Sequence, residues 1–279
     1  MALVSGIDVI NECVSRGLVA GAFNTTNLET TIGIIDAAER VGVPTFIQVA
    51  PTNVVLSGYE YIYDMVARRL EKSTVPIALH LDHGKSIEAV EAALAAQYTS
   101  IMIDSSEEPF AENVATSKRA RELTPASISL EAELGSISGK EDDVSAEFAN
   151  TTNPLEVEQF VSEVRPDMLA VSVGNTHGYA PNARIDFDLL GRVRDVSTVP
   201  LVIHGGSGLP SEQLGRLKDF GVVKFNVAAD LRNAMIRSFG EAYAANPNEN
   251  SLIRVSMEAV ASITNVVEAR IRTLNPSVA

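Results

Sequence analysis

Three of the four histidines stand at the ends of short apolar runs that are rich in β-branched residues. In chain order they are His83, His177 and His204, and the runs that precede them are Ile77–Leu81, Met168–Val173 and Leu201–Ile203. If these runs are parallel strands of a barrel, their carboxyl ends converge on one face, and the three imidazoles point into one site. Each histidine alone is better explained as a hydrogen-bonded rim residue. The coincidence of three favours a catalytic zinc, which needs three protein ligands and an open fourth position.

Acidic residues gather at the ends of similar runs. Asp82 directly precedes His83, Asp104 follows the run 100–103, and Glu131 and Glu133 end the run that begins at Ile128. Beside a divalent metal such carboxylates act as general acid, general base, extra ligand or orienter of a histidine. Any one of them could equally be a solvated rim residue, and Asp82 is the strongest candidate because it adjoins a proposed ligand. His80 lies inside its run and is interpreted as a packed structural histidine.

Glycine amides that could hold a phosphate follow the seventh run. His204 opens the sequence HGGSG, and a helix is expected to begin at Pro210 and Ser211. Asn226 opens a second candidate segment, NVAAD, after the eighth run. Glycine allows close approach of the backbone to an anion, and phosphate sites after the last two strands recur in α/β barrels. A glycine-rich turn is a weak signal alone, and its coincidence with the histidine face gives it weight.

The elements that must position these residues are eight short strands alternating with helices of 3.6-residue periodicity. The expected strands are Val19–Phe23, Thr45–Val49, Ile77–Leu81, Ser100–Ile103, Ile128–Ala132, Met168–Val173, Leu201–Ile203 and Val222–Phe225. The clearest helices are Leu28–Val41, Ile87–Ala96, Phe110–Leu123 and Pro154–Val164. This alternation predicts an α/β fold of the (β/α)8 barrel type. The 279 residues fit one such domain, 1–279, without a second core.

Segments outside the repeat have separate roles. The segment Gly6–Arg16 is expected to cap the bottom of the barrel, and Ser251–Thr273 to add one or two helices at the carboxyl end. The longest stretch without periodicity is Gly135–Asn153, which is rich in Gly, Ser, Asp and Asn. Loops of this length are usually functional or disordered.

Composition excludes several classes of function. A net charge of −14, without a Lys/Arg run longer than Arg68–Arg69, disfavours nucleic acid as a partner. No stretch approaches the roughly 18 uninterrupted apolar residues of a membrane span, so no membrane partner is expected. Asp8 and Glu12 stand where a secretory signal would be cationic and apolar, which favours a cytoplasmic location. Cys13 is the single cysteine and is expected to be a buried, inert thiol.

Seven segments, taken in order, resemble the motifs of class II ketose-bisphosphate aldolases of the short fructose/tagatose-bisphosphate type. They are AFNTTNLET, HLDHGKS, MIDSS, EAELGSISGKEDDVS, VSVGNTHG, VIHGGSG and KFNVAADL. The resemblance runs from about Leu3 to the last helix and implies a zinc-dependent lyase. Its substrate would be a phosphorylated ketose, and the protein would be a homo-oligomer, either a dimer or a tetramer.

The resemblance also implies residue roles. The catalytic zinc falls to His83, His177 and His204, and the acid/base that handles the C4 hydroxyl of the ketose is Asp82. Glu141 matches the loop carboxylate that exchanges a proton with dihydroxyacetone phosphate. Asp104 and Glu133 match a second divalent-metal position that is present in some members, and otherwise support the histidines. Asn24 matches a residue near the enediolate. Phosphate binding, often beside a monovalent cation such as Na⁺, falls to Gly178, Gly205, Gly206, Ser207, Asn226, Val227, Ala228, Ala229 and Arg232.

Three departures from the family pattern bear on the substrate. Ala50 stands where serine is common, and Ala180-Pro181 stand where a lysine often binds phosphate, with Arg184 as a candidate replacement. Ala228 is typical of the tagatose type rather than the fructose type, and Arg232 retains a cation for a distal phosphate. We therefore expect tagatose 1,6-bisphosphate or a related ketose phosphate, with glycolytic fructose 1,6-bisphosphate as the alternative.

Two other hypotheses stay open. Lys224 on the eighth run could form a Schiff base with the ketose, although a structural barrel lysine explains it better. The chain could also be a non-catalytic, aldolase-like partner subunit. Such a subunit would be expected to lose metal ligands or Asp82, and this chain retains them.

Overall fold

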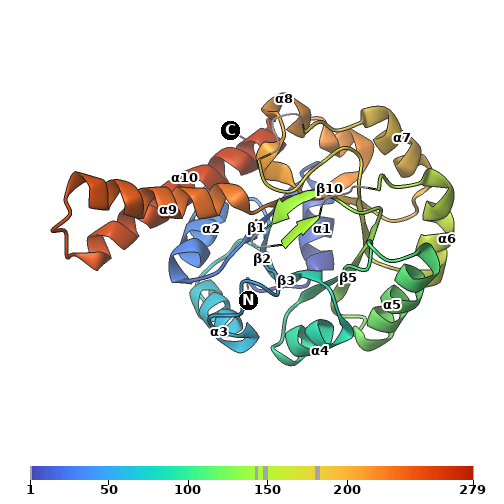
Figure 1. The fold of residues 1–279 in the computed structure, drawn as a ribbon, viewed down its shortest axis with the longest axis horizontal. Coiled ribbons are helices and arrows are strands. Elements are labelled where there is room, and N and C mark those ends of the chain that lie inside the picture. Colours follow the sequence, from blue (N-terminus) through green and yellow to red (C-terminus); the bar gives the residue numbers. More distant parts are fainter. Residues whose placement is uncertain (1, 142–143, 147–149, 180–182, 279) are drawn as a thin grey trace.

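The computed structural model describes residues 2–141, 144–146, 150–179 and 183–278. Within these residues eight parallel strands close into a barrel in the order β1-β10-β9-β8-β5-β4-β3-β2 (Figure 1). The strands are β1 (Ala20–Asn24), β2 (Thr45–Val49), β3 (Ile77–Gly84), β4 (Ser100–Ile103), β5 (Ser129–Leu134), β8 (Met168–Val171), β9 (Leu201–Ile203) and β10 (Val222–Val227). The predicted (β/α)8 architecture is confirmed.

The strand boundaries correct the sequence prediction at four functional points. We expected β1 to end at Phe23, β3 at Leu81, β5 at Ala132 and β10 at Phe225. The strands continue instead to Asn24, Gly84, Leu134 and Val227. The parallel pairing of β3 with β4 resumes at Gly84 after a register shift, so the strand outlasts its apolar run. Asp82, His83 and Asn226 therefore lie on strands of the barrel rather than beyond them, and the sheet itself fixes their backbone.

Helices surround the barrel (Figure 1). They are α1 (Gly6–Ser15), α2 (Leu28–Val41), α3 (Tyr59–Leu70), α4 (Ile87–Ala95), α5 (Phe110–Leu123), α6 (Pro154–Val164), α7 (Phe187–Val196), α8 (Ser211–Leu214), α9 (Ala229–Ala245) and α10 (Leu252–Leu274). The carboxyl-terminal tail forms the single helix α10, which packs against α2 and α9. The pair α9–α10 projects away from the barrel at the left of the view.

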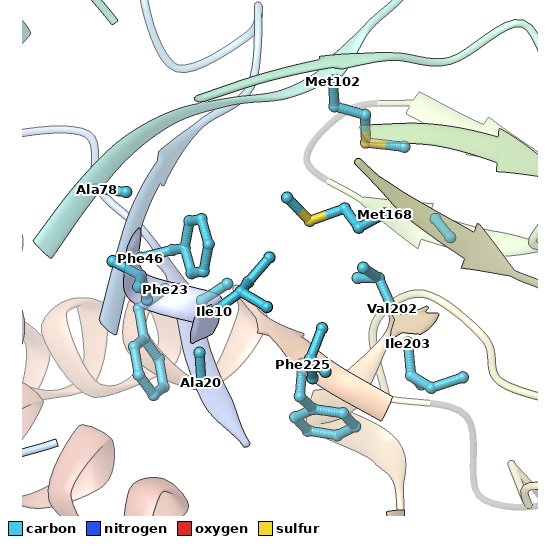
Figure 2. Close-up of a cluster of buried hydrophobic side chains, with 14 of the residues drawn as sticks. Ile10, Ala20, Phe23, Phe46, Ala78, Met102, Met168, Val202, Ile203 and Phe225 are labelled. Atoms are coloured by element: carbon cyan, nitrogen blue, oxygen red, sulfur yellow. The ribbon is translucent and has the colours of Figure 1, made fainter. Parts of the chain in front are cut away.

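Helix α1 closes the amino-terminal end of the barrel, as the sequence predicted. It packs against β1, β2, β3 and β10. A Cβ on Gly6, its first residue, would lie 2.2 Å from Ser129 Oγ and 2.7 Å from Ser100 Oγ, so any other residue would force these side chains to shift. Figure 2 shows Ile10 of α1 in the buried hydrophobic cluster that also contains Phe46, Phe225 and Met168. Active-site chemistry is thereby confined to the opposite, carboxyl-terminal end.

The thiol of Cys13 is buried on the inner side of α1, 3.6 Å from Pro44 O. Burial raises its pKa to about 12, so the thiol stays protonated at neutral pH. The expectation of an inert structural cysteine agrees with this environment. In the ranges described above, no helix combines the length and the apolar character needed to cross a membrane.

The stretch Gly135–Asn153, which shows no periodicity in the sequence, includes regular structure that the sequence did not indicate. It contains a short antiparallel hairpin of β6 (Gly139–Glu141) and β7 (Val144–Ala146). Gly139 has a φ of 115°, and a Cβ there would lie 2.4 Å from His177 O. His177 N also donates to Ser138 O at 2.8 Å. The hairpin therefore starts directly against the backbone of a proposed metal ligand.

Candidate active site and metal centre

The three predicted histidine ligands meet at the carboxyl-terminal mouth of the barrel. The ring centroid of His83 lies 5.1 Å from that of His177 and 4.6 Å from that of His204, and the His177 and His204 centroids are 6.4 Å apart. His204 is fully buried, whereas His177 is half-buried. His83 and His204, 121 positions apart in the sequence, thus share one site with His177 because the carboxyl ends of the strands converge there.

His83 reaches this site through an unusual backbone conformation. It has a φ of 46°, in the left-handed region that non-glycine residues rarely adopt. The register shift between β3 and β4 falls between Leu81 and Gly84, around His83. Irregularities of this kind next to active sites re-aim a side chain at a cost of about 1–3 kcal/mol. The strain at His83 accompanies its placement between Asp104 and His204.

One nitrogen of each of two histidines is directed at the other. His83 Nε2 and His204 Nδ1 are 2.9 Å apart. The remaining nitrogens are occupied, because His83 Nδ1 is 2.6 Å from Asp104 Oδ2 and His204 Nε2 is 2.7 Å from Glu131 Oε1. Since an ionised carboxylate only accepts hydrogen bonds, both outer nitrogens carry a proton. The two inner nitrogens are therefore oriented as a metal centre requires, and this donor pair fits zinc.

The pKa values of His83 and His204 describe the protonation of this site in its metal-free form. Burial alone would lower its pKa, but the carboxylates of Asp82 and Asp104 outweigh burial and raise this pKa to about 10. Burial lowers the pKa of His204. A protonated His83 can then donate from Nε2 to a neutral His204 at Nδ1. A metal ion that takes both nitrogens must displace that proton.

Behind His204 lies a fully buried ionic network. Burial alone would raise the pKa of Glu131, but the Lys224 ammonium at 3.0 Å from Oε2 and the His204 hydrogen bond hold it below the usual range. Burial and the Lys224 charge keep the pKa of His80 well below its ordinary value. His80 Nδ1 lies 2.7 Å from Ser100 Oγ, as expected for a structural histidine. Glu131 is thus kept ionised as the acceptor that orients His204.

Asp104 and Glu133 stand behind His83 with opposite properties. Burial alone would raise the pKa of Asp104, but hydrogen bonds from His83 and Lys85 hold it well below its usual value. Burial and the neighbouring Asp104 charge raise the pKa of Glu133 well above normal. Ligand atoms of Asp82, His83 and His204 lie within 4.8 Å of one another, and so do those of His83, Asp104 and Glu133. Two overlapping clusters can therefore attract cations.

Asp82 is fully buried, and three amide side chains donate to it. Asn24 Nδ2 and Gln48 Nε2 lie 2.9 Å and 3.1 Å from Oδ2, and Asn226 Nδ2 lies 3.0 Å from Oδ1. Gln48 also donates to Asn24 Oδ1 at 2.7 Å. These bonds hold the carboxylate beside His83 and His204, where it can receive a proton from a bound substrate. Asn24, which the resemblance matched to a residue near the enediolate, thus lies in direct contact with Asp82.

The glycine segment after β9 forms a tight turn between the candidate metal centre and α9. Gly205 has a φ of 70°, and a Cβ there would lie 2.2 Å from Thr176 O. The helix expected after this segment is only the four-residue α8, too short to attract an anion through its dipole. The 17-residue α9 begins instead at Ala229, with Ala228 as its N-cap and Val227 as the last residue of β10. Ser207 Oγ accepts from Asp230 N at 3.3 Å, which brings the two segments together.

A family model described as fructose-bisphosphate aldolase class-II matches residues 4–277. The chain belongs to the class II fructose-bisphosphate aldolase family. It is a lyase, and zinc dependence is general in this family. The chain is 38% identical to the fructose-bisphosphate aldolase of Geobacillus stearothermophilus over 253 residues, which cover 89% of this chain and 88% of the relative. The resemblance inferred from the motifs is confirmed.

Two solved structures extend the comparison. The YdjI aldolase of Escherichia coli K12 superposes with a TM-score of 0.85 at 28% identity, covering 98% of both chains. A putative fructose-1,6-bisphosphate aldolase of Coccidioides immitis gives a TM-score of 0.87 at 27% identity, covering 98% of this chain and 97% of that one. The barrel is therefore shared with these aldolases over its whole length.

For several predicted site residues of this aldolase, the structure describes only the backbone or the burial, or nothing at all. The backbone of Glu141 belongs to β6, but its side chain lies outside the described part of the structure, as do Ala180 and Pro181 entirely. Gly178 has a φ of 73°, next to His177. Arg232 is half-buried in α9. The catalytic and binding roles of these residues stay predictions.

Sequence reasoning missed three residues that support the aldolase site. Gln48 binds Asp82 and Asn24, Lys85 binds Asp104 at 2.7 Å, and Arg270 of α10 holds Asp230 at 2.7 Å. Glu131, which the sequence marked only as one of several acidic candidates, binds His204. A polar residue inside a predicted strand was the available signal for Gln48. No sequence signal linked Arg270 to this site, because α10 reaches it only through the packing of the barrel.

Proposed function

We propose that this aldolase reversibly cleaves a phosphorylated ketose to dihydroxyacetone phosphate and an aldehyde, with a zinc ion held by His83, His177 and His204. The observation that carries the proposal is the 2.9 Å approach of His83 Nε2 to His204 Nδ1, with each outer nitrogen held by a carboxylate. Such outer hydrogen bonds fix the tautomer and orientation of metal-binding histidines. We propose that residues 1–279 act as one domain.

Zinc bound there would polarise the ketose carbonyl and stabilise negative charge beside it. Asp82 takes the proton of the C4 hydroxyl as the C3–C4 bond breaks, and the released aldehyde forms its C=O from that oxygen. The bonding electrons move towards the carbonyl side of the remaining fragment. Glu141 then supplies a proton to C3, which completes dihydroxyacetone phosphate. The start of the Glu141 hairpin against His177 supports this assignment.

We propose that the backbone at Gly178, Gly205, Gly206 and Ser207, with Asn226 to Ala229, receives the phosphate. The tight turn at Gly205 and the start of α9 at Ala229 support this placement. A monovalent cation such as Na⁺ beside the phosphate stays a prediction, as does a cytoplasmic location.

The substrate we favour is tagatose 1,6-bisphosphate or a related ketose phosphate. Ala228 and Ala50 are both buried near the mouth and offer no side-chain hydrogen bond to a hydroxyl. The alternative substrate is fructose 1,6-bisphosphate, which is supported by the relative from Geobacillus stearothermophilus because that protein is named a fructose-bisphosphate aldolase. Comparing kcat/KM for the fructose, tagatose and related mono- and bisphosphates decides between them.

The Schiff-base hypothesis receives no support from the environment of Lys224. Its ammonium is fully buried, 3.0 Å from Glu131 Oε2 and 2.7 Å from Asn226 Oδ1. A nucleophilic amine must be neutral and reach the substrate, whereas this group is engaged as a counter-charge. Borohydride treatment with substrate should therefore leave the enzyme active. Substrate-dependent inactivation that persists in chelator would instead favour Lys224.

The central experiment is metal analysis of the purified protein and of His83→Ala, His177→Ala and His204→Ala. We expect about one zinc per chain in the wild type. Each variant should lose zinc and activity together. Full zinc occupancy and activity in any one variant would remove that residue from the site, and an inactive, zinc-free wild type would favour the non-catalytic subunit.

We also propose that the enzyme is a homo-oligomer, either a dimer or a tetramer. The projecting pair α9–α10 carries large exposed apolar side chains, namely Ile236, Tyr243, Leu252, Ile253 and Met257. Exposed apolar patches of this kind are typical of association surfaces. Light scattering after size exclusion should give a multiple of the 29.8 kDa chain mass. A monomer at micromolar concentration would contradict the proposal.

A further inference from the structure

Lys85 has no role in the function proposed above, yet it touches the centre. It follows Gly84 at the end of β3, and its ammonium lies 2.7 Å from Asp104 Oδ2 and 3.9 Å from Glu107 Oε1. The Lys85 side chain is 49% exposed, whereas that of Asp104 is 2% exposed. The lysine thus approaches from solvent and places its positive charge against a buried carboxylate.

The cluster that Lys85 enters has the donors of a cation site. Ligand atoms of His83, Asp104 and Glu133 lie within 4.8 Å of one another. Among the described residues, the buried Glu133 Oε2 has no hydrogen-bond partner. Two carboxylates and an imidazole suit a divalent ion, and Glu133 Oε2 lies 3.8 Å from His83 Nδ1 within the same cluster.

We propose that the Lys85 ammonium takes the electrostatic place of a second divalent cation at this cluster, so that the enzyme operates with one metal ion per chain. Asp104 Oδ2 already accepts from His83 Nδ1 and Lys85 Nζ, and Oδ1 accepts from Ser106 Oγ at 2.7 Å. A dication bound to Asp104 would therefore stand beside an ammonium and compete with it. The inference rests on the proposed zinc site at the three histidines.

The size of the effect follows from the charges. A dication and an ammonium about 4 Å apart, even with the screening of water, repel enough to weaken binding by a factor on the order of 30. The exposed Lys85 side chain can move towards Glu107, so it weakens the binding of a second cation without preventing it. If Lys85 and Asp104 formed only an ordinary surface ion pair, removing the charge of Lys85 would leave the affinity for a second metal ion unchanged.

Equilibrium dialysis against increasing Zn²⁺, with the metal quantified, tests the inference on the wild type and three variants. Lys85→Met keeps the length of the side chain and removes its charge, and Lys85→Arg keeps the charge. Lys118→Met is the matched control, because Lys118 is 48% exposed and pairs with Glu163 at 3.6 Å on the outer surface. Circular dichroism verifies that each variant is folded.

We expect one tight zinc per chain in every protein and a second zinc that binds roughly 30-fold more tightly in Lys85→Met than in the wild type. Lys85→Arg and Lys118→Met should match the wild type. An unchanged second site in Lys85→Met, or two equally tight ions in the wild type, would overturn the role of Lys85 while leaving the histidine site intact. A wild type that binds no zinc would overturn both proposals.

Discussion

Replacement of Glu131 by glutamine should disable the metal site without touching a metal ligand. The carboxylate serves two partners at once: Oε1 accepts from His204 Nε2 at 2.7 Å, and Oε2 forms an ion pair with Lys224 Nζ at 3.0 Å. A glutamine has one oxygen for these two partners. If that oxygen turns to Lys224, the amide NH₂ faces His204 Nε2 and favours the tautomer whose Nδ1 carries the proton. The nitrogen needed by the metal is then blocked.

The magnitude follows from complete burial, since both side chains of the Lys224–Glu131 pair are 0% exposed. Removing one partner of a buried pair costs about 3–5 kcal/mol, which corresponds to a fall in Tm of roughly 6–20 °C for a domain of this size. Loss of an outer-shell orienter weakens metal binding by about 10- to 100-fold. We therefore expect Glu131→Gln to show both effects.

The double variant Glu131→Gln with Lys224→Met tests whether zinc affinity is lost through the orientation of the glutamine amide or through a general loss of stability. Without the ammonium, the glutamine oxygen is free to accept from His204. Its NH₂ can then donate to His80 Nε2, which lies 3.5 Å from the Glu131 Oε2 position. The double variant should recover zinc affinity and melt above Glu131→Gln, with a coupling energy of about 0.5–3 kcal/mol. Thermal unfolding of chelator-treated protein and zinc competition titrations measure the two quantities, and strictly additive losses would refute the reasoning.

Four further predictions concern the same site. Asp82→Ala should keep zinc and fold but lose cleavage by about 10²-fold or more, and a loss of zinc would instead make Asp82 a ligand or orienter. Because the pKa of His83 is raised from 6.5 to about 10, its proton stabilises the metal-free fold fully below pH 6.5, and this contribution is lost as pH rises towards 10. Zinc affinity should rise about tenfold per pH unit over that window, and a flat profile in chelator competition would contradict the prediction. Fructose 1,6-bisphosphate should be the poorer substrate by a factor on the order of 10–10², and Arg232→Ala should raise KM more for a bisphosphate than for its monophosphate. A kcat/KM for fructose 1,6-bisphosphate above that of every other ketose phosphate, or equal effects on both KM values, would refute these two statements.

The barrel could be predicted because its signals are local. The strands β2, β4 and β9 were predicted at their observed boundaries, since each is a short apolar run ended by a change of composition. Parallel barrel strands are covered on both faces and therefore appear as continuous apolar runs. The hairpin at Gly139 was missed because its strands contain only three residues each, too few for periodicity to emerge.

The site could be predicted only as a set of residue types at strand ends. The convergence of His83, His177 and His204 follows from barrel geometry, which any (β/α)8 chain shares. The pairing of His204 with Glu131 joins strands that are not neighbours, since β8 lies between β5 and β9. Such contacts across the barrel interior depend on side-chain length and strand register, which composition does not reveal.

His83 shows the difference between what the sequence indicates and what the structure reveals. Its place after an apolar run and beside Asp82 marked it as a ligand, but the run gave no sign that the strand continues to Gly84. The ring reaches His204 from a left-handed φ of 46° at a register shift. That conformation is unfavourable for any non-glycine residue, so local propensity argues against it. Asp104 on His83 Nδ1 and His204 at Nε2 hold the ring from both sides, and the strain is sustained by contacts between strands rather than by the sequence around it.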